Sequence, residues 1–306
     1  MDLSKSLPFV VFILIGVVAG RRYALDKSSF SKLLLYFVSP IVFFETTWGS
    51  QIGFADLGLP VLIWLLASAL AIVAYRVSAR FMGSPDSNLL GFAMGSSNSG
   101  YFGLPVAAAL YGSEFLPQMV LVVMGFSLFE YTTGFYVTAR SHFSVKSSFK
   151  KLFALPAIYA FLLGLLLNEA GILRSELMNP LSTYLRGAYS FLGLMVLGLG
   201  LADISWKTFD PKFLLQAFGS RFIAWPVAVA LIVALLRLDP SGAAFRALAL
   251  VAFLPMAANG VVIATELKAS PHKIAGAIAL STAASLVALN ANVHLAFIRF
   301  VAELAG

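Results

Sequence analysis

Residues 95–105 read GSSNSGYFGLP and interrupt an apolar segment, roughly residues 89–110, that is long enough to cross a bilayer. The stretch holds three glycines, three serines, one asparagine and one proline. Glycine and serine weaken a helix, and proline removes a backbone donor and clashes with the preceding turn. In lipid every freed backbone group needs a partner, so such a break persists only inside protein or beside a polar cavity. The sequence therefore predicts a broken helix that lines a path across the membrane.

The composition of the chain is that of an integral membrane protein. Of its 306 residues, 60% are hydrophobic and only 11% are charged, which is too little polar surface for a domain whose exterior faces water. The net charge of +7 comes from basic residues scattered over short loops. These basic residues form no continuous patch or arm, which argues against nucleic acid as a partner. The absence of cysteine excludes disulfides, thiolate metal sites and cysteine nucleophiles.

Apolar stretches of about 20 residues divide the chain into ten predicted transmembrane helices joined by short loops. They lie near residues 6–22, 30–48, 57–79, 88–111, 115–139, 150–170, 178–202, 211–237, 243–267 and 272–300. Lys and Arg concentrate in the loops that follow the odd-numbered helices, and the loop after the eighth helix is the one ambiguous case. The positive-inside rule then predicts a multi-pass protein of the cell membrane with both termini on the extracytoplasmic side. Positive charge behind the first helix, with Lys5 alone before it, favours a retained helix over a signal peptide.

Two stretches far apart in the chain are alike. LPFVVFILIG at residues 7–16 and LPAIYAFLLG at residues 155–164 align without a gap and share Leu, Pro and Gly at the same spacing. The same offset plus two residues carries Pro105 onto Pro255. With five helices per half, the halves would enter the membrane in opposite directions, which is the inverted repeat of many secondary transporters.

The predicted halves are residues 1–140, with helices one to five, and residues 141–306, with helices six to ten. The second half has its own break, FLPMAAN at residues 253–259. A lone proline kink is ordinary in a membrane helix, but interrupted spans at matching positions of two halves indicate a transport site near the midplane. Where such spans cross, half-helix N-termini point inward, and their positive dipole ends favour an anion.

Residues 98–105, NSGYFGLP, resemble the N-[ST]-x-x-x-G-[IL]-P signature in the fourth helix of the auxin efflux carrier family, which includes the plant PIN exporters and many bacterial transporters. Residues 21–45 are similar to the family's first cytoplasmic loop and second helix, and residues 254–286 to its ninth and tenth helices. The resemblance implies an all-α membrane protein of ten helices in an inverted five-plus-five repeat. It also implies elevator-type motion of a crossover-bearing transport domain against a scaffold. Bile acid:sodium symporters share that architecture, and a homodimer through the scaffold domain is a possible assembly.

Carried over by position, Asn98, Pro105 and Pro255 fall on the family's crossover. The chain departs from the family pattern in two respects. Its central loop, about residues 140–151, is far shorter than in the long plant members, so their regulatory phosphorylation is not implied. Glu45 stands where the family commonly has histidine, so no role is carried over to that position.

The candidate substrate-binding residues lie at the two breaks. They are Ser97, Asn98, Ser99, Gly103, Pro105, Pro255, Met256 and Asn259. An asparagine side chain both donates and accepts hydrogen bonds, which suits a carboxylate or a cation. The alternative is that Asn98 and Asn259 only satisfy carbonyls that the breaks free.

The candidate ion-coupling residues centre on Glu130, because an ionisable residue at membrane depth is costly and usually faces the protein interior. Ser127 and Thr132 could complete an oxygen cage for Na⁺, or Glu130 could carry a proton; the alternative is a structural hydrogen bond. Glu45, near the outer end of the second helix, is a further candidate that could simply reach water. Arg221 could attract an anion or pair with Glu130, but we favour snorkelling toward the cytoplasmic face.

The predicted function is secondary active transport of a small organic anion, an auxin-like carboxylate or a dicarboxylate, with coupling to Na⁺ or H⁺ and no other cofactor. The alternative is a sodium-coupled symporter of the bile-acid type. An intramembrane enzyme is less favoured, because no G-x-S-x-G elbow or H-E-x-x-H pair appears. A channel is less favoured because the polar residues are asymmetric and not repeated. No histidine has a second ligand at metal-binding spacing. Small residues of the tenth helix, such as Ser281, are predicted to pack helices together.

Overall fold

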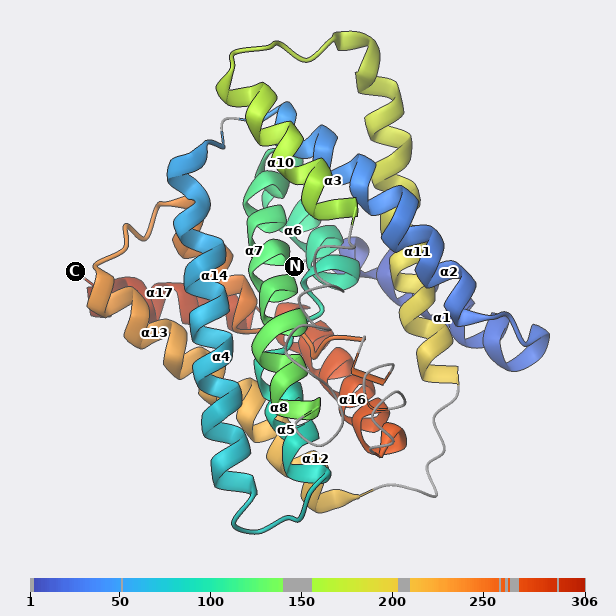
Figure 1. Cartoon of the computed structure of the whole chain (residues 1–306), viewed down its shortest axis with the longest axis vertical. Helices are drawn as coiled ribbons and strands as arrows, with labels where there is room; N and C mark the ends of the chain where they lie inside the picture. Colours follow the sequence, from blue (N-terminus) through green and yellow to red (C-terminus); the bar gives the residue numbers. More distant parts are fainter. Residues whose placement is uncertain are drawn as a thin grey trace.

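A computed structural model of the chain describes residues 3–50, 52–139, 156–202, 210–258, 260–261, 264, 270–290 and 292–305. Within these ranges every regular element is helical and no strand occurs (Figure 1). The α-helices are α1 Leu3–Tyr23, α2 Lys27–Leu33, α3 Ser39–Trp48, α4 Gly58–Ser78, α5 Asp86–Gly95, α6 Leu104–Tyr111, α7 Leu116–Phe129, α8 Phe135–Ala139, α10 Pro156–Glu169, α11 Asn179–Ala202, α12 Pro211–Gly219, α13 Trp225–Leu236, α14 Ala243–Val251, α16 Pro271–Asn290 and α17 Val293–Ala305. The predicted boundary between the two halves, after residue 140, lies outside the described residues.

Shorter helical segments join or continue these helices. The π-helical ones are η1 Leu34–Val38, η3 Ser99–Gly103, η5 Glu130–Gly134 and η8 Ser220–Ala224, and the 3₁₀ ones are η2 Phe54–Leu57, η4 Ser113–Phe115 and η6 Glu176–Met178. A π-helical turn inserts one extra residue into an α-helix and often marks a functional position. Each of these four π segments leads directly into an α-helix.

Six continuous helical stretches are long and apolar enough to cross a membrane. They are Lys27–Trp48, Phe54–Ser78, Ser113–Thr138, Glu176–Ala202, Pro211–Leu236 and His272–Asn290. Their number and length are those of a multi-pass integral membrane protein. The predicted fourth span is missing from this set because its break divides it into α5 and α6, neither of which is long enough to cross a bilayer by itself.

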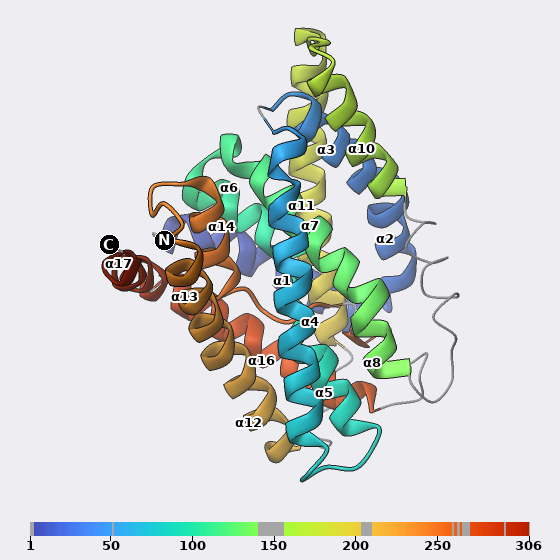
Figure 2. The same cartoon turned by 60° about the vertical axis from the view of Figure 1, so that its left-hand side comes forward.

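The predicted tenth span is also divided. We expected one helix near residues 272–300, but α16 ends at Asn290 and α17 begins at Val293. Between them Asn292 has a φ of 57°, a left-handed conformation that asparagine tolerates better than most residues and that turns the chain. As a result α17 lies across the direction of α4 in Figure 1 and is seen nearly end-on in Figure 2.

The helices pack in two groups. Group A consists of α1, α2, α3, α10 and α11, with α1 packed along α11 and α3 along α10. Group B consists of the other described helices, in which α4 packs against α5 and α7, and α12 against α16. Figure 1 shows α3 and α10 side by side, and Figure 2 shows α4 in front with α5 beside its lower end. The two groups meet where η3 contacts α11 and α3 contacts α7.

Glycines allow the closest helix contacts within group A. A Cβ added to Gly16 of α1 would overlap the carbonyl oxygen of Met195 in α11, and one on Gly198 would overlap that of Ile13. On the other pair, a Cβ on Gly164 of α10 would lie 2.8 Å from the carbonyl oxygen of Phe44 in α3. Small residues let membrane helices approach to backbone contact, where van der Waals packing is strongest.

Candidate functional site

The two predicted breaks meet inside group B. The helix α5 ends at Gly95 and the chain becomes extended at Ser96, with φ −85° and ψ 155°, before helical structure resumes at Ser99. In the second half α14 ends at Val251, and residues 252–258 are not helical. The backbone amide of Asn98 donates a hydrogen bond of 2.8 Å to the carbonyl oxygen of Pro255. Each break therefore satisfies a backbone group of the other, as an interruption at membrane depth requires.

Two serine hydroxyls complete this contact. The backbone amide of Ala257 donates to Ser96 Oγ at 3.4 Å, and that of Met256 donates to Ser281 Oγ at 3.2 Å. Ser281 thus does more than the helix packing that we predicted for it, because it accepts from an amide that the second break leaves without a helical partner. The polar residues of the breaks and of α16 together take the place of the missing helical hydrogen bonds.

A cavity of about 80 Å³ lies beside the crossing, between the two helix groups. A single water molecule needs roughly 10–15 Å³ on the same measure of cavity volume. The cavity therefore has room for several waters or a small polar group. Group A supplies Ser39, Phe43, Ala157, Ile158 and Tyr189, and η1, which joins α2 to α3, supplies Leu35. Group B supplies Ser97, Asn98, Ser99, Gly100, Tyr101, Val123, Met124, Phe126, Ser127, Glu130, Ala257 and Ala258.

Asn98 is the most informative residue of the cavity wall. Its side chain is 96% buried, and its Nδ2 donor has no hydrogen-bond partner among the described residues. An unsatisfied buried donor costs about 1–3 kcal/mol. An acceptor oxygen of a bound molecule would remove that cost.

Three further predicted substrate residues, Ser97, Ser99 and Gly103, lie in two different environments. Ser97 and Ser99 line the cavity with Asn98. Gly103 faces the protein interior, where a Cβ would lie 3.0 Å from Leu254 Cδ1. The missing side chain of Gly103 therefore lets the first break pack closely against the second.

The remaining predicted substrate residues shape the crossing without lining the cavity. Pro105 is the second residue of α6, directly after η3, and has no amide hydrogen to donate back into that turn. Pro255 supplies the carbonyl that binds Asn98, and Met256 is buried. Asn259 lies outside the described residues.

The ion-coupling candidates of the fifth span divide between two environments. Glu130, at the start of η5, is 92% buried and lines the cavity together with Ser127. Thr132 faces α4 instead: its hydroxyl donates to the carbonyl oxygen of Leu128 at 2.5 Å and accepts from Trp64 Nε1 at 3.0 Å. The structure thus brings Glu130 and Ser127 to the substrate candidates and holds Thr132 away from them.

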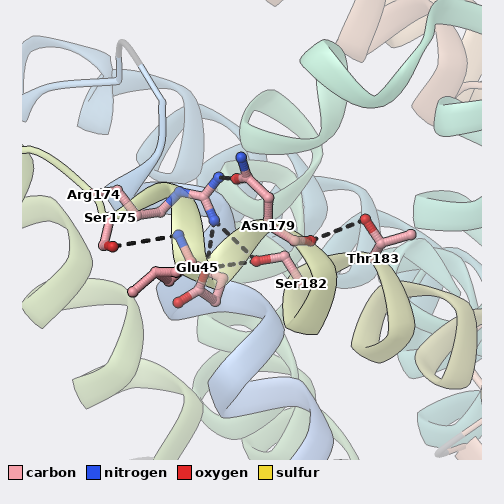
Figure 3. A network of polar contacts seen from close by, with 7 residues as sticks. Glu45, Arg174, Ser175, Asn179, Ser182 and Thr183 are labelled. Atoms are coloured by element: carbon pink, nitrogen blue, oxygen red, sulfur yellow. Dashed lines mark hydrogen bonds and ion pairs between the residues drawn. The ribbon is translucent and has the colours of Figure 1, made fainter.

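Glu45 belongs to a separate network within group A, drawn in Figure 3. It is 99% buried, and its Oε2 accepts from Arg174 Nη1 at 2.7 Å and from Ser182 Oγ at 2.6 Å. Arg174 also donates to Ser182 at 3.0 Å and to Asn179. Burial excludes the alternative that Glu45 reaches water. The network joins the end of α3 to the start of α11 and does not line the cavity.

Our interpretation of Arg221 as a snorkelling residue is wrong. Its side chain is completely buried in η8. Its Nε donates to the carbonyl oxygen of Leu254 at 2.6 Å, and its Nη2 donates to that of Val251 at 2.7 Å and to Ser97 Oγ at 3.2 Å. Among the described residues no carboxylate lies within ion-pair distance of it, so it does not pair with Glu130. Instead, Arg221 donates hydrogen bonds to residues of both breaks.

All four π segments of the described chain contribute to this site. Leu35 of η1, Tyr101 of η3 and Glu130 of η5 line the cavity, and η8 supplies Arg221. The sequence reasoning missed the aromatic wall made by Phe43, Phe126, Tyr101 and Tyr189, because aromatic residues are common throughout an apolar chain. The sequence did carry one sign that the helix of Arg221 is irregular, namely the dipeptide Trp225-Pro226 that begins four residues later.

Comparisons with known proteins agree with this geometry. The family described as Membrane transport protein matches residues 3–291. An uncharacterized transporter of the archaeon Methanothermobacter thermautotrophicus is 27% identical over 297 residues, which cover 92% of this chain and 94% of the relative. An uncharacterized transporter of Methanocaldococcus jannaschii is 27% identical over 298 residues, which cover 92% of this chain and 95% of the relative.

Proposed function

We propose that this chain, which belongs to the membrane transport protein family that includes the auxin efflux carriers, is a secondary active transporter of a small organic anion. The observation that carries the proposal is Asn98 Nδ2, an unpaired buried donor in the wall of the cavity where the two breaks cross. A carboxylate oxygen is the natural acceptor for such a donor, because hydrogen bonds to charged groups are roughly twice as strong as neutral ones.

The direction of the half-helices supports an anion. The segment η3, which continues into α6, begins at Ser99 beside the cavity, so the positive end of that helical stretch faces the bound molecule. The hydroxyls of Ser97 and Ser99 add two donors at the same place. Anions bind at helix N-termini because unsatisfied amide groups and the helix dipole act together.

The walls of the cavity favour an aromatic monocarboxylate within the predicted substrate class. The rings of Tyr101 and Phe43 lie 6.2 and 6.3 Å from that of Tyr189, which is within the range of favourable aromatic contacts. The described residues that line the cavity include no lysine, arginine or histidine, so they offer no cation to a second carboxylate. The chemistry of this wall therefore suits an auxin-like carboxylate better than a dicarboxylate such as malonate. The cavity of about 80 Å³ is smaller than the roughly 150 Å³ that holds a benzene ring, so groups A and B would have to move apart to admit such a substrate.

Glu130 is the proposed coupling residue. Its carboxyl lies in the same cavity as Asn98 and Ser127, so its charge would act directly on a bound anion. Protonation of Glu130, or Na⁺ held by Glu130 and Ser127, would remove the repulsion between two carboxylates at short range. This is also the observation that favours the sodium-symporter alternative, and a comparison of Na⁺ and pH dependence separates the two.

An elevator mechanism is supported by the position of the cavity. It lies between group A and group B, so movement of one group against the other would carry the site toward either face of the membrane. We assign group A to the scaffold, through which a homodimer would form, and group B to the transport domain. Rigid-body movement of one helix bundle against the other is the general basis of alternating access in secondary transporters.

The proposed ten-helix inverted repeat is supported by matched contacts in group A. Gly16 and Gly164 occupy the same position of the two aligned stretches. Gly16 packs against the backbone of α11, and Gly164 packs against the backbone of α3. In an inverted repeat the first helix corresponds to the sixth and the seventh to the second, so these are equivalent contacts.

The proposal is tested with purified protein in detergent. Thermal unfolding is measured against a panel of aromatic monocarboxylates and short dicarboxylates, with NaCl or choline chloride at equal ionic strength. A ligand that binds the folded state raises the unfolding temperature, and the stabilisation grows with the logarithm of the ligand concentration over Kd. We expect stabilisation by an aromatic monocarboxylate and uptake of the same compound into proteoliposomes. Stabilisation by no carboxylate, together with no uptake, would refute the anion assignment.

A further inference from the structure

Arg221 and Trp225 bind the C-terminal ends of both half-helices. Arg221 donates to the carbonyl oxygen of Val251, the last residue of α14, and to that of Leu254. One turn later Trp225 Nε1 donates at 2.6 Å to the carbonyl oxygen of Met94, at the end of α5. The guanidinium carbon of Arg221 lies 4.8 Å from the centre of the Trp225 ring. The two side chains thus form one donor unit for the crossing.

The positive charge of Arg221 balances the partial negative charges at the C-terminal ends of α5 and α14. The C-terminus of a helix carries the equivalent of about −0.5 elementary charge, so the ends of α5 and α14 together present about −1. The guanidinium of Arg221 carries one positive charge and has no carboxylate partner among the described residues. A buried charge is tolerated only when it is paired and hydrogen-bonded. Here the pairing comes from helix ends and carbonyl groups.

In transporters with broken helices, unwound carbonyls and half-helix C-termini are the groups that coordinate the coupling cation, while half-helix N-termini face an anionic substrate. In this chain the carbonyls of Val251 and Leu254 are already taken by Arg221. From this we infer that Arg221 is a fixed internal cation, which occupies the position where a mobile Na⁺ would bind and holds the crossing in its anion-binding arrangement. The inference rests on the proposed function and adds a positioning residue to it.

Arg221 acts on the site through Ser97. Its Nη2 donates to Ser97 Oγ, and Ser97 is the neighbour of Asn98 in the cavity wall. Because Arg221 offsets the negative C-terminal ends of α5 and α14, the positive N-terminal end of η3 at Ser99 dominates the local electrostatic field. A lysine would supply the same charge from a single ammonium group, which cannot reproduce the planar fork that reaches two carbonyls and a hydroxyl.

The test compares wild type with Arg221→Met and Arg221→Lys, with Arg299→Met as the matched control, because Arg299 is exposed in α17. Anion affinity is measured by thermal shift with the aromatic monocarboxylate that stabilises wild type, in NaCl and in choline chloride. Hydrogen exchange of peptides covering residues 94–103 and 251–258 is measured without any anion. We expect Arg221→Met to weaken anion binding about tenfold or more, Arg221→Lys to be intermediate, and Arg299→Met to match wild type.

The exchange measurement separates this inference from the proposed function. Arg221→Met should speed exchange at the two breaks while leaving peptides of α1 and α11 protected, whether or not any anion binds. If wild type binds no anion and the exchange pattern is as expected, the proposed function fails and the structural role of Arg221 stands. Wild-type exchange and affinity in Arg221→Met would overturn the inference. So would Na⁺-enhanced binding that persists in Glu130→Gln.

Arg221→Met could fail to fold, since it removes a buried donor of three hydrogen bonds. In that case Ser97→Ala and Trp225→Phe each remove one contact of the same unit. We expect faster exchange around residues 94–98 in Trp225→Phe and weaker anion binding in Ser97→Ala. Unchanged behaviour of both variants would overturn the inference.

Discussion

The backbone amide of Asn98 and the carbonyl oxygen of Pro255, 157 positions apart in the chain, form a hydrogen bond of 2.8 Å. This bond joins the two interrupted spans and fixes the backbone of Asn98. The side chain of Asn98 then faces the cavity with an unpaired donor. The same residue therefore connects the fold of the crossing to the proposed chemistry of the site.

Asn98→Ala should weaken anion binding about tenfold or more, because a hydrogen bond to a charged group contributes about 1.5–3 kcal/mol. It should leave the protein folded, since the backbone bond to Pro255 is kept. The measurement is the Kd obtained by fitting the thermal shift as a function of ligand concentration. Asn88→Ala is the matched control: Asn88 Nδ2 already donates to the carbonyl oxygen of Val137 at 2.6 Å, so this variant should lose stability and keep its affinity. Wild-type affinity in Asn98→Ala would contradict the site assignment.

Glu130→Gln should abolish the dependence of transport on the coupling ion. The substitution keeps the size of the side chain but removes the charge that protonation or Na⁺ would neutralise. Uptake into proteoliposomes is measured with imposed pH and Na⁺ gradients. Glu114→Gln, at an exposed residue of η4, should behave as wild type. Unaltered gradient dependence in Glu130→Gln would remove Glu130 from the mechanism.

Glu45→Ala should destabilise the protein and leave anion affinity and ion dependence unchanged. The substitution removes the carboxylate that accepts from both Arg174 and Ser182, and breaking a buried ion pair in this way costs about 3–5 kcal/mol. A double-mutant cycle with Arg174→Ala checks this, because the two destabilising effects should fall well short of additivity. A change in Na⁺ or pH dependence with normal stability would instead place Glu45 in the coupling machinery.

Gly198→Ala should disrupt the packing of α1 on α11, since the new methyl group would overlap the carbonyl oxygen of Ile13. Overpacking of this kind typically costs about 1–3 kcal/mol. Gly187→Ala in the same helix has open space around the new Cβ, and it should be neutral or stabilising because alanine favours a helix by roughly 1 kcal/mol over glycine. Thermal unfolding of the two variants gives the comparison. Equal stability of both would show that the close approach is dispensable.

Acid should weaken the contact between α5, α12 and α16. Lys273 of α16 lies 2.5 Å from Asp86 and 2.7 Å from Asp210, and the hydrogen bond from Lys273 lowers the pKa of Asp210 below its ordinary value of 3.8. A lowered pKa in the folded state means that the stabilisation is present above the unfolded pKa, near 3.8, and is lost as the pH falls through the folded pKa. The effect is modest, because the Asp210 side chain is 29% exposed.

The check is the unfolding temperature between about pH 6 and pH 3. Wild type should lose stability below about pH 4. Lys273→Met should be less stable at pH 6 and show a smaller decrease. The same acid decrease in both proteins would assign it to other carboxylates.

The breaks at residues 95–105 and 253–259 could be located from the sequence because helix propensity is a property of contiguous residues. Glycine, serine and proline interrupt a helix wherever they cluster in an apolar segment, whatever packs around them. The membrane class followed in the same way, from a composition that no water-facing domain could use. The sequence prediction was wrong at the tenth span, where α16 ends at Asn290 and the left-handed residue Asn292 precedes α17.

Membership of the transporter family was thus determined by the sequence. The sequence also singled out Asn98 and Glu130 as candidates, because one lies in a local motif and the other is a carboxyl at membrane depth, where it is costly. Only the tertiary structure decided which groups meet. Arg221 reaches Ser97 across 124 positions, and Arg174 reaches Glu45 across 129. Both guanidinium groups could have extended to water by sequence alone. Helix packing instead placed Arg221 against two carbonyl ends and Arg174 against a buried carboxylate, because a contact between distant residues depends on the arrangement of whole helices and not on the residues themselves.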